Sequence, residues 1–214
     1  VESTAPPRQL SAEQVQKLRS AESDLLALSK YEQELTGPET KFVYHETTTD
    51  RLPDIYTAGG LISLPPVRRT ELDDRFDAAV ATTRPDLAGT FTRTGAVYAH
   101  PTQEAARNLG ENPARVLLKI RIQGPVDPIV ASAQRYTTAF SQPSLTDQEV
   151  KAYWEEAITL SQFKENYREN RYFWEYTRDY YPADPAVEKL PQSILFPEVL
   201  IPASVKNENI QIVS

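Results

Sequence analysis

The segment RVLLKIRI, residues 115–122, constrains the fold most, because it is the clearest strand in the chain. Gly124-Pro125 ends it with a turn signal. Shorter apolar runs of the same kind predict further strands at 42–45, 96–99, 194–201 and 210–213. Segments with helical spacing lie between these strands, so the sequence predicts a domain of mixed helices and strands, which we assign to the α+β class.

The first helix is predicted over residues 11–36, where Ser11 and Gln14 form a capping-box pattern and Gly37-Pro38 ends the apolar spacing. Residues 1–9 before it are expected to be a flexible lead-in. We expect the helix to pack on the domain that follows, with docking of a partner as the alternative. Three further segments complete this half: a short helix at 51–58, a long surface loop at 65–95 with a short helix around 71–80, and a helix at 102–109.

The second half of the chain has a different composition. All seven glycines lie at or before Gly124, whereas ten of the twenty aromatic side chains lie between Tyr153 and Tyr181. A capping-box pattern at Thr146 and Glu149 opens this stretch. So many aromatics cannot share one buried stripe, so we expect two helices with a break near 164–170. Residues 131–192 are interpreted as a helical insertion packed by its own aromatics.

The composition excludes several classes of site. The chain has no cysteine, which excludes disulfides, thiolate nucleophiles and Cys-ligated metals, and only two histidines, His45 and His100. The net charge of −7 argues against nucleic acid as a partner. No run is long and apolar enough for a membrane helix. The chain also lacks methionine and starts at Val1, from which we expect a processed or excised piece.

Three predicted strands each contain one conspicuous polar residue: His45 in FVYHET, Tyr98 in AVYAH and Glu198 in LFPEVLIP. Because strand residues alternate between faces, each points either to solvent or into a cleft. Taken singly, Glu198 fits an exposed edge position, His45 a structural histidine and Tyr98 a core tyrosine. We expect His100 to be solvated.

Taken together and in this order, these blocks resemble the ADP-ribosyltransferase superfamily. The resemblance covers 41–130 and 193–214, which we interpret as the catalytic core of a single domain. The first block is Tyr44-His45-Glu46-Thr47 followed by Gly59-Gly60-Leu61, the second is the strand of Tyr98 before Glu104-Ala105-Ala106, and the last begins at Pro197-Glu198. His45 and Tyr98 resemble the His-Tyr-Glu group, which includes diphtheria-toxin-like enzymes and poly(ADP-ribose) polymerases.

The resemblance implies a small, split, mostly antiparallel sheet around a cleft for NAD, which is a substrate of these enzymes. It assigns catalysis to Glu198, and NAD binding to His45, Glu46, Thr47 and Tyr98. A carboxylate stabilises the positive charge that forms on the ribose when the nicotinamide bond breaks. A histidine can bind a ribose hydroxyl through one ring nitrogen while Thr47 or the backbone fixes the other, and Tyr98 can stack on nicotinamide. No metal is required.

Several residues depart from the family pattern. Glu46 stands where the family often has glycine, and Asn108 or Leu109 stands where polymerase-like members have a second tyrosine. Phe196 occupies the position, two before Glu198, that often indicates the acceptor, so the acceptor residue stays open. The alternative is therefore an inactive interaction module that keeps the fold. An RNA-directed relative would need a basic groove, which the net charge disfavours.

The predicted function is mono-ADP-ribosyl transfer from NAD to a macromolecular acceptor, expected to be a protein. The expected setting is a bacterial toxin or effector that is secreted or delivered into a target cell. If they are exposed, aromatic residues of the insertion are candidates for gripping the target, because aromatics dominate interface hot spots. These candidates are Tyr153, Trp154, Tyr172 and Trp174, with Arg168, Arg171 and Arg178 for an acidic partner.

Overall fold

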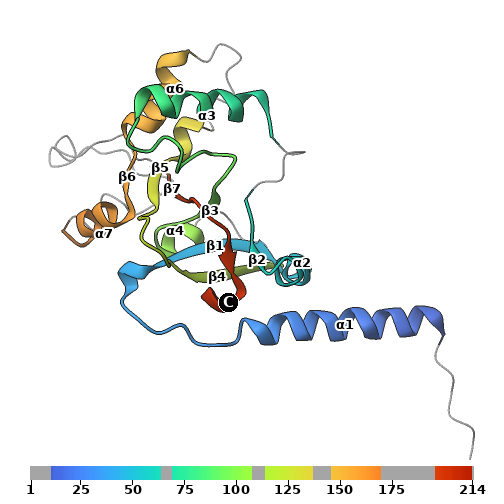
Figure 1. Ribbon diagram of the computed structural model, residues 1–214. Helices are drawn as coiled ribbons and strands as arrows, with labels where there is room; N and C mark the ends of the chain where they lie inside the picture. Colours follow the sequence, from blue (N-terminus) through green and yellow to red (C-terminus); the bar gives the residue numbers. More distant parts are fainter. Residues whose placement is uncertain (1–10, 64–68, 108–113, 137–145, 170–195, 214) are drawn as a thin grey trace, which may run out of the picture.

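Short antiparallel sheets stacked between helices make up the fold, which confirms the α+β prediction (Figure 1). The structure is a computed structural model that describes residues 11–63, 69–107, 114–136, 146–169 and 196–213. Its helices are α1 (Ala12–Lys30), α2 (Leu52–Thr57), α3 (Glu71–Thr83), α4 (Gln103–Arg107), α6 (Asp147–Glu155) and α7 (Leu160–Glu169). Its strands are β1 (Phe42–Thr48), β2 (Gly60–Leu61), β3 (Val97–Ala99), β4 (Arg115–Arg121), β5 (Ile129–Ser132), β6 (Ile158–Thr159), β7 (Pro197–Ile201), β8 (Val205–Lys206) and β9 (Ile210–Ile212).

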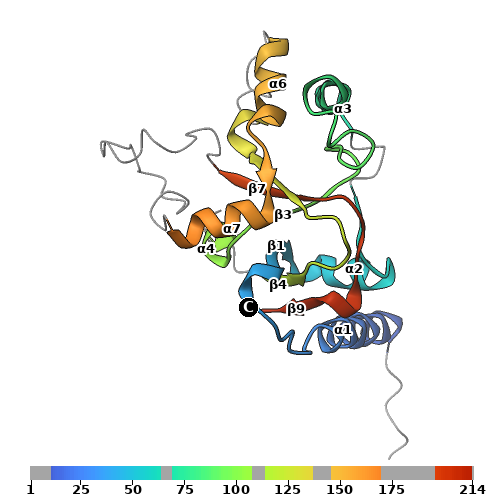
Figure 2. The same cartoon turned by 60° about the vertical axis from the view of Figure 1, so that its left-hand side comes forward.

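Two main sheets form the middle layers of the molecule. One has the order β1-β4-β9 and the other the order β3-β7-β5-β6, and every neighbouring pair is antiparallel. A two-stranded pair, β2-β8, accompanies them. Both views show the layers in one sequence: α1, then the three-stranded sheet, then the four-stranded sheet, then α3 with α6 (Figures 1 and 2).

Helix α1 begins where the sequence predicts and ends six residues earlier than the predicted 36. Ser11 and Gln14 form the predicted capping box. At the other end the Tyr31 side chain is fully buried, and its hydroxyl donates to Asn207 Oδ1 at 2.9 Å. The chain therefore leaves the helical path at Tyr31, because this anchor holds it against the segment before β9.

The short helix predicted around 71–80 is confirmed as α3, whereas the loop predicted for the rest of 65–95 is not confined to the surface in its described part. Helix α3 occupies 71–83, with a capping box between Thr70 and Asp73. Phe76 and Val80 from α3, and Leu87 and Phe91 after it, are buried in a second hydrophobic cluster together with residues of α6 and of strands β5 and β7. The few large apolar residues of this segment are spaced to face one side, so they suffice for a core.

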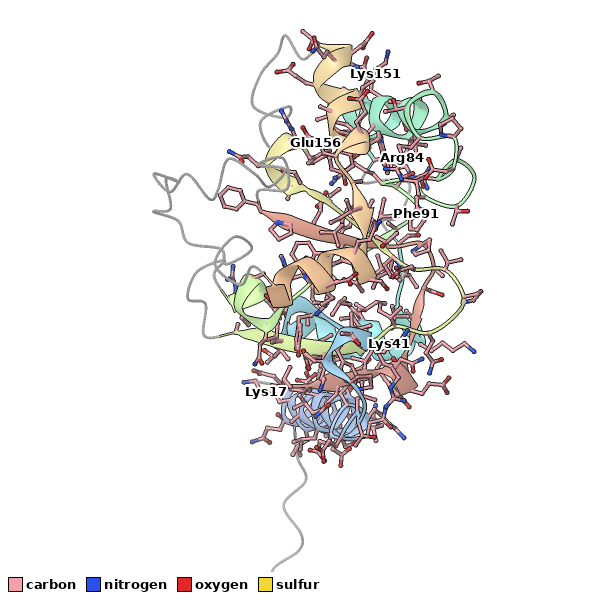
Figure 3. The ribbon with its side chains drawn as sticks, turned by 90° about the vertical axis from the view of Figure 1, so that its left-hand side faces the viewer. Lys17, Lys41, Arg84, Phe91, Lys151 and Glu156 are labelled. Carbon is pink, nitrogen blue, oxygen red and sulfur yellow. The ribbon has the colours of Figure 1, made fainter. Side chains whose placement is uncertain are left out.

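The break in the second helical stretch lies earlier than the predicted 164–170. Helix α6 ends at Glu155, the strand β6 follows, and α7 starts at Leu160. Arg84, which follows α3 and is labelled in Figure 3, donates from Nη1 to the carbonyl oxygens of Trp154 and Ala157 at 3.3 and 2.9 Å, at the end of α6. Cations near a helix C-terminus satisfy its free carbonyls, which explains the early stop.

Strand β5 was not predicted, although it joins the second sheet at its centre. All four of its residues are buried, and it pairs with β7 on one side and β6 on the other. The start of the 131–192 segment thus lies within a strand, and Tyr153 and Trp154 pack on Phe76 of α3. Within its described residues, the segment is therefore packed into the core of the molecule.

Candidate functional site

Tyr98 and Glu198 project from neighbouring strands onto the same face of the four-stranded sheet. Tyr98 on β3 is paired with Leu200 on β7, and Glu198 lies two residues before Leu200, opposite Ala131 of β5. Directly paired residues share a face, and so do residues two apart along a strand. This face is the one covered by α3 and α6.

His45 reaches this pair of strands from the other main sheet. Its Nδ1 lies 2.7 Å from the carbonyl oxygen of Tyr98. The contact is fixed by a backbone bridge next to it, in which Tyr44 N donates to His100 O at 2.8 Å and His100 N donates to Tyr44 O at 2.6 Å. The two sheets are therefore joined at the point where His45 and Tyr98 meet.

Burial lowers the pKa of His45, although the contact with the Tyr98 carbonyl opposes the shift. The ring is therefore neutral at pH 7. A neutral imidazole has one donor and one acceptor, so the donor faces the carbonyl and Nε2 is the acceptor. His100, expected to be solvated, is in fact only partly exposed, and burial together with the nearby His45 lowers its pKa to about 4.

Glu198 is held by two donors that sequence reasoning did not assign to the site. Nη1 of Arg93 and the hydroxyl of Tyr153 both donate to Oε1 of Glu198, the latter at 2.7 Å. Arg93 Nη1 also donates to the Tyr153 hydroxyl at 2.7 Å. The three side chains form a closed triangle, in which Arg93 is 6% and Glu198 13% exposed.

Aromatic rings surround the Arg93 guanidinium. Its central carbon lies 3.5 Å from the ring centre of Tyr136, 5.0 Å from that of Tyr98 and 5.1 Å from that of Tyr153. Tyr98 also donates from its hydroxyl to the Arg93 carbonyl oxygen at 2.6 Å. A guanidinium is weakly hydrated and attracted to aromatic faces, which is why this cation can be buried here.

Helix α3 fixes the backbone of this arginine. Asp77 accepts from the backbone nitrogen of Arg93 at 2.5 Å, from that of Thr94 at 3.3 Å, and from the Thr94 hydroxyl. Asp73 lies with Oδ1 4.0 Å from Arg93 Nε and accepts from Tyr136 at 2.8 Å. Burial raises the pKa of Asp73, but its hydrogen bonds and the Arg93 charge outweigh burial and lower it overall.

The same electrostatics act on the tyrosines. Burial, reinforced by the Glu198 carboxylate, raises the pKa of Tyr98 and of Tyr153, against the opposing charge of Arg93. Both hydroxyls therefore keep their protons at neutral pH and act as donors. For Arg93 burial lowers the pKa, but the surrounding Tyr153, Glu198 and Tyr98 raise it overall, so it stays charged.

The two remaining predicted residues lie on opposite faces of β1. Thr47 shares the face of His45 and is buried. Glu46 faces the other way and forms an ion pair with Arg115, while its Oε2 is buried without a hydrogen bond. Burial raises the pKa of Glu46 against the opposing charge of Arg115. The structure thus brings the Tyr98 and Glu198 side chains together through Arg93, whereas His45 contacts only the Tyr98 backbone and Glu46 lies on the opposite face of β1.

Two of the residues considered for gripping a target are not available for it. Tyr153 and Trp154 are fully buried, and Trp154 donates to the carbonyl oxygen of Phe76 at 2.7 Å. Tyr172, Trp174, Arg171 and Arg178 lie outside the described residues, as does the Arg168 side chain. Asn108 and Leu109 lie outside them too.

Arg93 and Asp73 could not be recognised from the sequence, because they sit in a Thr- and Asp-rich segment typical of loops. Tyr153 was visible only as one of many clustered aromatics. Within the described residues, no group of three or more His, Asp or Glu side chains could hold a metal ion. No helix in that part of the chain is long and apolar enough to cross a membrane.

Comparisons of the chain with protein-family models, with curated proteins and with solved structures gave no match.

Proposed function

We propose that this protein is a mono-ADP-ribosyltransferase that transfers ADP-ribose from NAD to a protein acceptor and releases nicotinamide. One observation carries the proposal: Tyr98 and Glu198, 100 residues apart in sequence, lie on one face of the four-stranded sheet with Arg93 contacting both, and His45 contacts the Tyr98 backbone from the neighbouring sheet. The resemblance of their sequence blocks to the ADP-ribosyltransferases supports the same reaction.

Glu198 supplies the negative charge that the reaction needs. Breaking the bond between nicotinamide and ribose creates a positively charged, oxocarbenium-like ribose. A carboxylate in a largely buried position stabilises this charge better than one in water. Glu198 fits this role, because its side chain is 13% exposed and its orientation is fixed by hydrogen bonds.

His45 and Tyr98 fit a binding role toward NAD. With Nδ1 against the Tyr98 carbonyl, Nε2 of His45 can accept a hydrogen bond from a ribose hydroxyl. Tyr98 offers an aromatic face for nicotinamide, and the Arg93 guanidinium lies 5.0 Å from its ring centre. Thr47 lies on the same face of β1 as His45, so it fits the binding role. Glu46 pairs with Arg115 on the opposite face and does not share that role.

A catalytically inactive interaction module on the same fold is the second candidate. It is favoured by the fact that Oε1 of Glu198 already accepts from Arg93 and Tyr153, as in an ion pair that only stabilises a core. We extend the enzyme proposal to a toxin or effector that is secreted or delivered into a target cell, with a protein as its acceptor.

Transfer of label from NAD to the proteins of a cell lysate tests the enzyme proposal. We expect the wild type to label discrete proteins and Glu198→Gln to lose at least about a hundredfold in rate, since it removes the stabilising charge. Glu156→Gln is the matched control, because Glu156 also pairs with an arginine, Arg135, but outside the site. Absence of both label transfer and nicotinamide release in the wild type favours the inactive module.

A further inference from the structure

We propose that Arg93 and Tyr153 are positioning residues that hold Oε1 of Glu198 and thereby present Oε2 to the ribose of NAD. The inference rests on the proposed transferase function and adds two residues to it. It assigns the two carboxylate oxygens different tasks, with Oε1 as the anchor and Oε2 as the oxygen that meets the substrate.

The two oxygens of the Glu198 carboxylate differ in the hydrogen bonds that they accept. Both donors that the described residues provide, Arg93 Nη1 and the Tyr153 hydroxyl, end on Oε1. The Glu198 side chain keeps 13% of its surface exposed, and none of the described residues donates to Oε2. Oε2 is therefore the oxygen whose hydrogen-bonding capacity the described residues leave for a ligand.

The Arg93–Glu198 pair differs from the two-bond arrangement that is common between an arginine and a carboxylate. An arginine and a carboxylate commonly pair through two parallel hydrogen bonds that use both oxygens. Here Nη1 of Arg93 serves both Glu198 and Tyr153, while its Nε is buried without a hydrogen bond, 4.0 Å from Asp73. Arg93 and Glu198 are therefore joined by one hydrogen bond and not by two, and Oε2 of Glu198 receives none from Arg93.

Both positioning groups are themselves rigidly held. The Arg93 guanidinium lies 3.5 Å from the Tyr136 ring centre, and Asp77 fixes its backbone. The fully buried Tyr153 ring packs edge-on against Phe76 and Trp154, with centroid distances of 5.0 Å to each. Groups with so little freedom can fix the orientation of a third side chain, as a preorganised site requires.

The variant Tyr153→Phe tests the inference, because it removes one hydroxyl and keeps the ring. We expect kcat for nicotinamide release to fall roughly tenfold to hundredfold while KM for NAD stays within about twofold, since a hydrogen bond to a charged group is lost. The matched control is Tyr31→Phe, which removes an equally buried hydroxyl bonded to Asn207, far along the chain from Glu198. We expect it to keep the wild-type kcat at a similar thermal stability.

Equal kcat losses in Tyr153→Phe and Tyr31→Phe would overturn the positioning role and leave the proposed function standing. Absence of turnover in the wild type would instead overturn the proposed function. Crystal structures of Arg93→Lys and Tyr153→Phe give a readout that needs no turnover. We expect Glu198 to leave its single orientation in both, and an unchanged Glu198 in both contradicts the inference.

Discussion

His45 on β1 lies with Nδ1 2.7 Å from the carbonyl oxygen of Tyr98 on β3, so a side chain of one sheet is fastened to the backbone of the other. The bridge between Tyr44 and His100 lies directly beside this contact. Both histidines of the chain thus sit at the junction of the two sheets. The stability of this junction should depend on their protonation.

The first prediction concerns acid stability. His100 has a pKa of about 4 in the folded protein against 6.5 for a free histidine, because it is buried and lies near His45. The unfolded chain therefore takes up the proton first as the pH falls, so stability is full above pH 6.5 and is lost on the way to pH 4. We expect His100 alone to account for a loss on the order of 3 kcal/mol over this range.

Urea unfolding at pH 7.5 and at pH 4 measures this loss. His100→Gln removes the titrating group but keeps the backbone bridge to Tyr44, so its stability should fall less than that of the wild type between the two values. The lowered pKa of His45 contributes in the same direction in both proteins. Identical losses in the two proteins would contradict the assignment to His100.

The second prediction concerns the buried charge of Arg93. Arg93→Met keeps a long side chain among the tyrosine rings that surround Arg93, but it leaves the Glu198 carboxylate without its cation. Removing one partner of a buried ion pair costs about 3–5 kcal/mol, because the other charge is left uncompensated. We expect a loss of that size in the free energy of unfolding, measured with urea at pH 7.

Lys17→Ala provides the control for this experiment. Lys17 pairs with Glu13 at 3.2 Å on α1, with both side chains more than three-quarters exposed. An exposed pair contributes less than about 1 kcal/mol, so this variant should unfold almost as the wild type does. If Arg93→Met unfolds with the same free energy as Lys17→Ala, the positive charge of Arg93 does not stabilise the folded protein.

The third prediction compares two neighbouring glycines at the turn into β2. Gly60 has φ of +140°, and a Cβ there would lie 1.8 Å from the carbonyl oxygen of Val205 on β8. Gly59 has φ of +83°, but a Cβ added there would meet nothing within 4 Å. We expect Gly59→Ala to cost about 1–2 kcal/mol through backbone strain alone.

Gly60→Ala should cost on the order of 4 kcal/mol, because β2 must also separate from β8. Thermal unfolding of the two variants side by side measures the difference. Equal losses would mean that the β2–β8 pairing does not hold Gly60 against Val205.

Local signals in the sequence predict much of the fold. The capping-box patterns predicted at Ser11 and Thr146 both begin helices in the structure, and 115–121 forms the predicted strand. Strand β5 escaped prediction because its four residues follow a proline-rich turn and serve only as a central strand, paired on both sides. That pairing is a long-range property, which no local pattern of four residues reveals.

The candidate site, too, could be predicted only in part from the sequence. His45, Tyr98 and Glu198 stand out as single polar residues in apolar strands, and the structure places Tyr98 and Glu198 on one face with His45 against the Tyr98 backbone. Arg93 and Asp73 could not be found, because their burial depends on aromatic rings contributed by α6 and by residues after β5. The sequence around Arg93 is typical of an exposed loop, so it does not indicate that the side chain is buried among these rings.

The most direct test of the proposed function is a crystal structure of the Glu198→Gln protein with NAD, since this variant should bind NAD without turning it over. We expect NAD at the junction of β1, β3 and β7, with a ribose hydroxyl within hydrogen-bond distance of His45 Nε2 and the nicotinamide ribose facing residue 198. NAD bound elsewhere, or no NAD bound at millimolar concentration, would contradict the proposal that His45, Tyr98 and Glu198 serve one substrate.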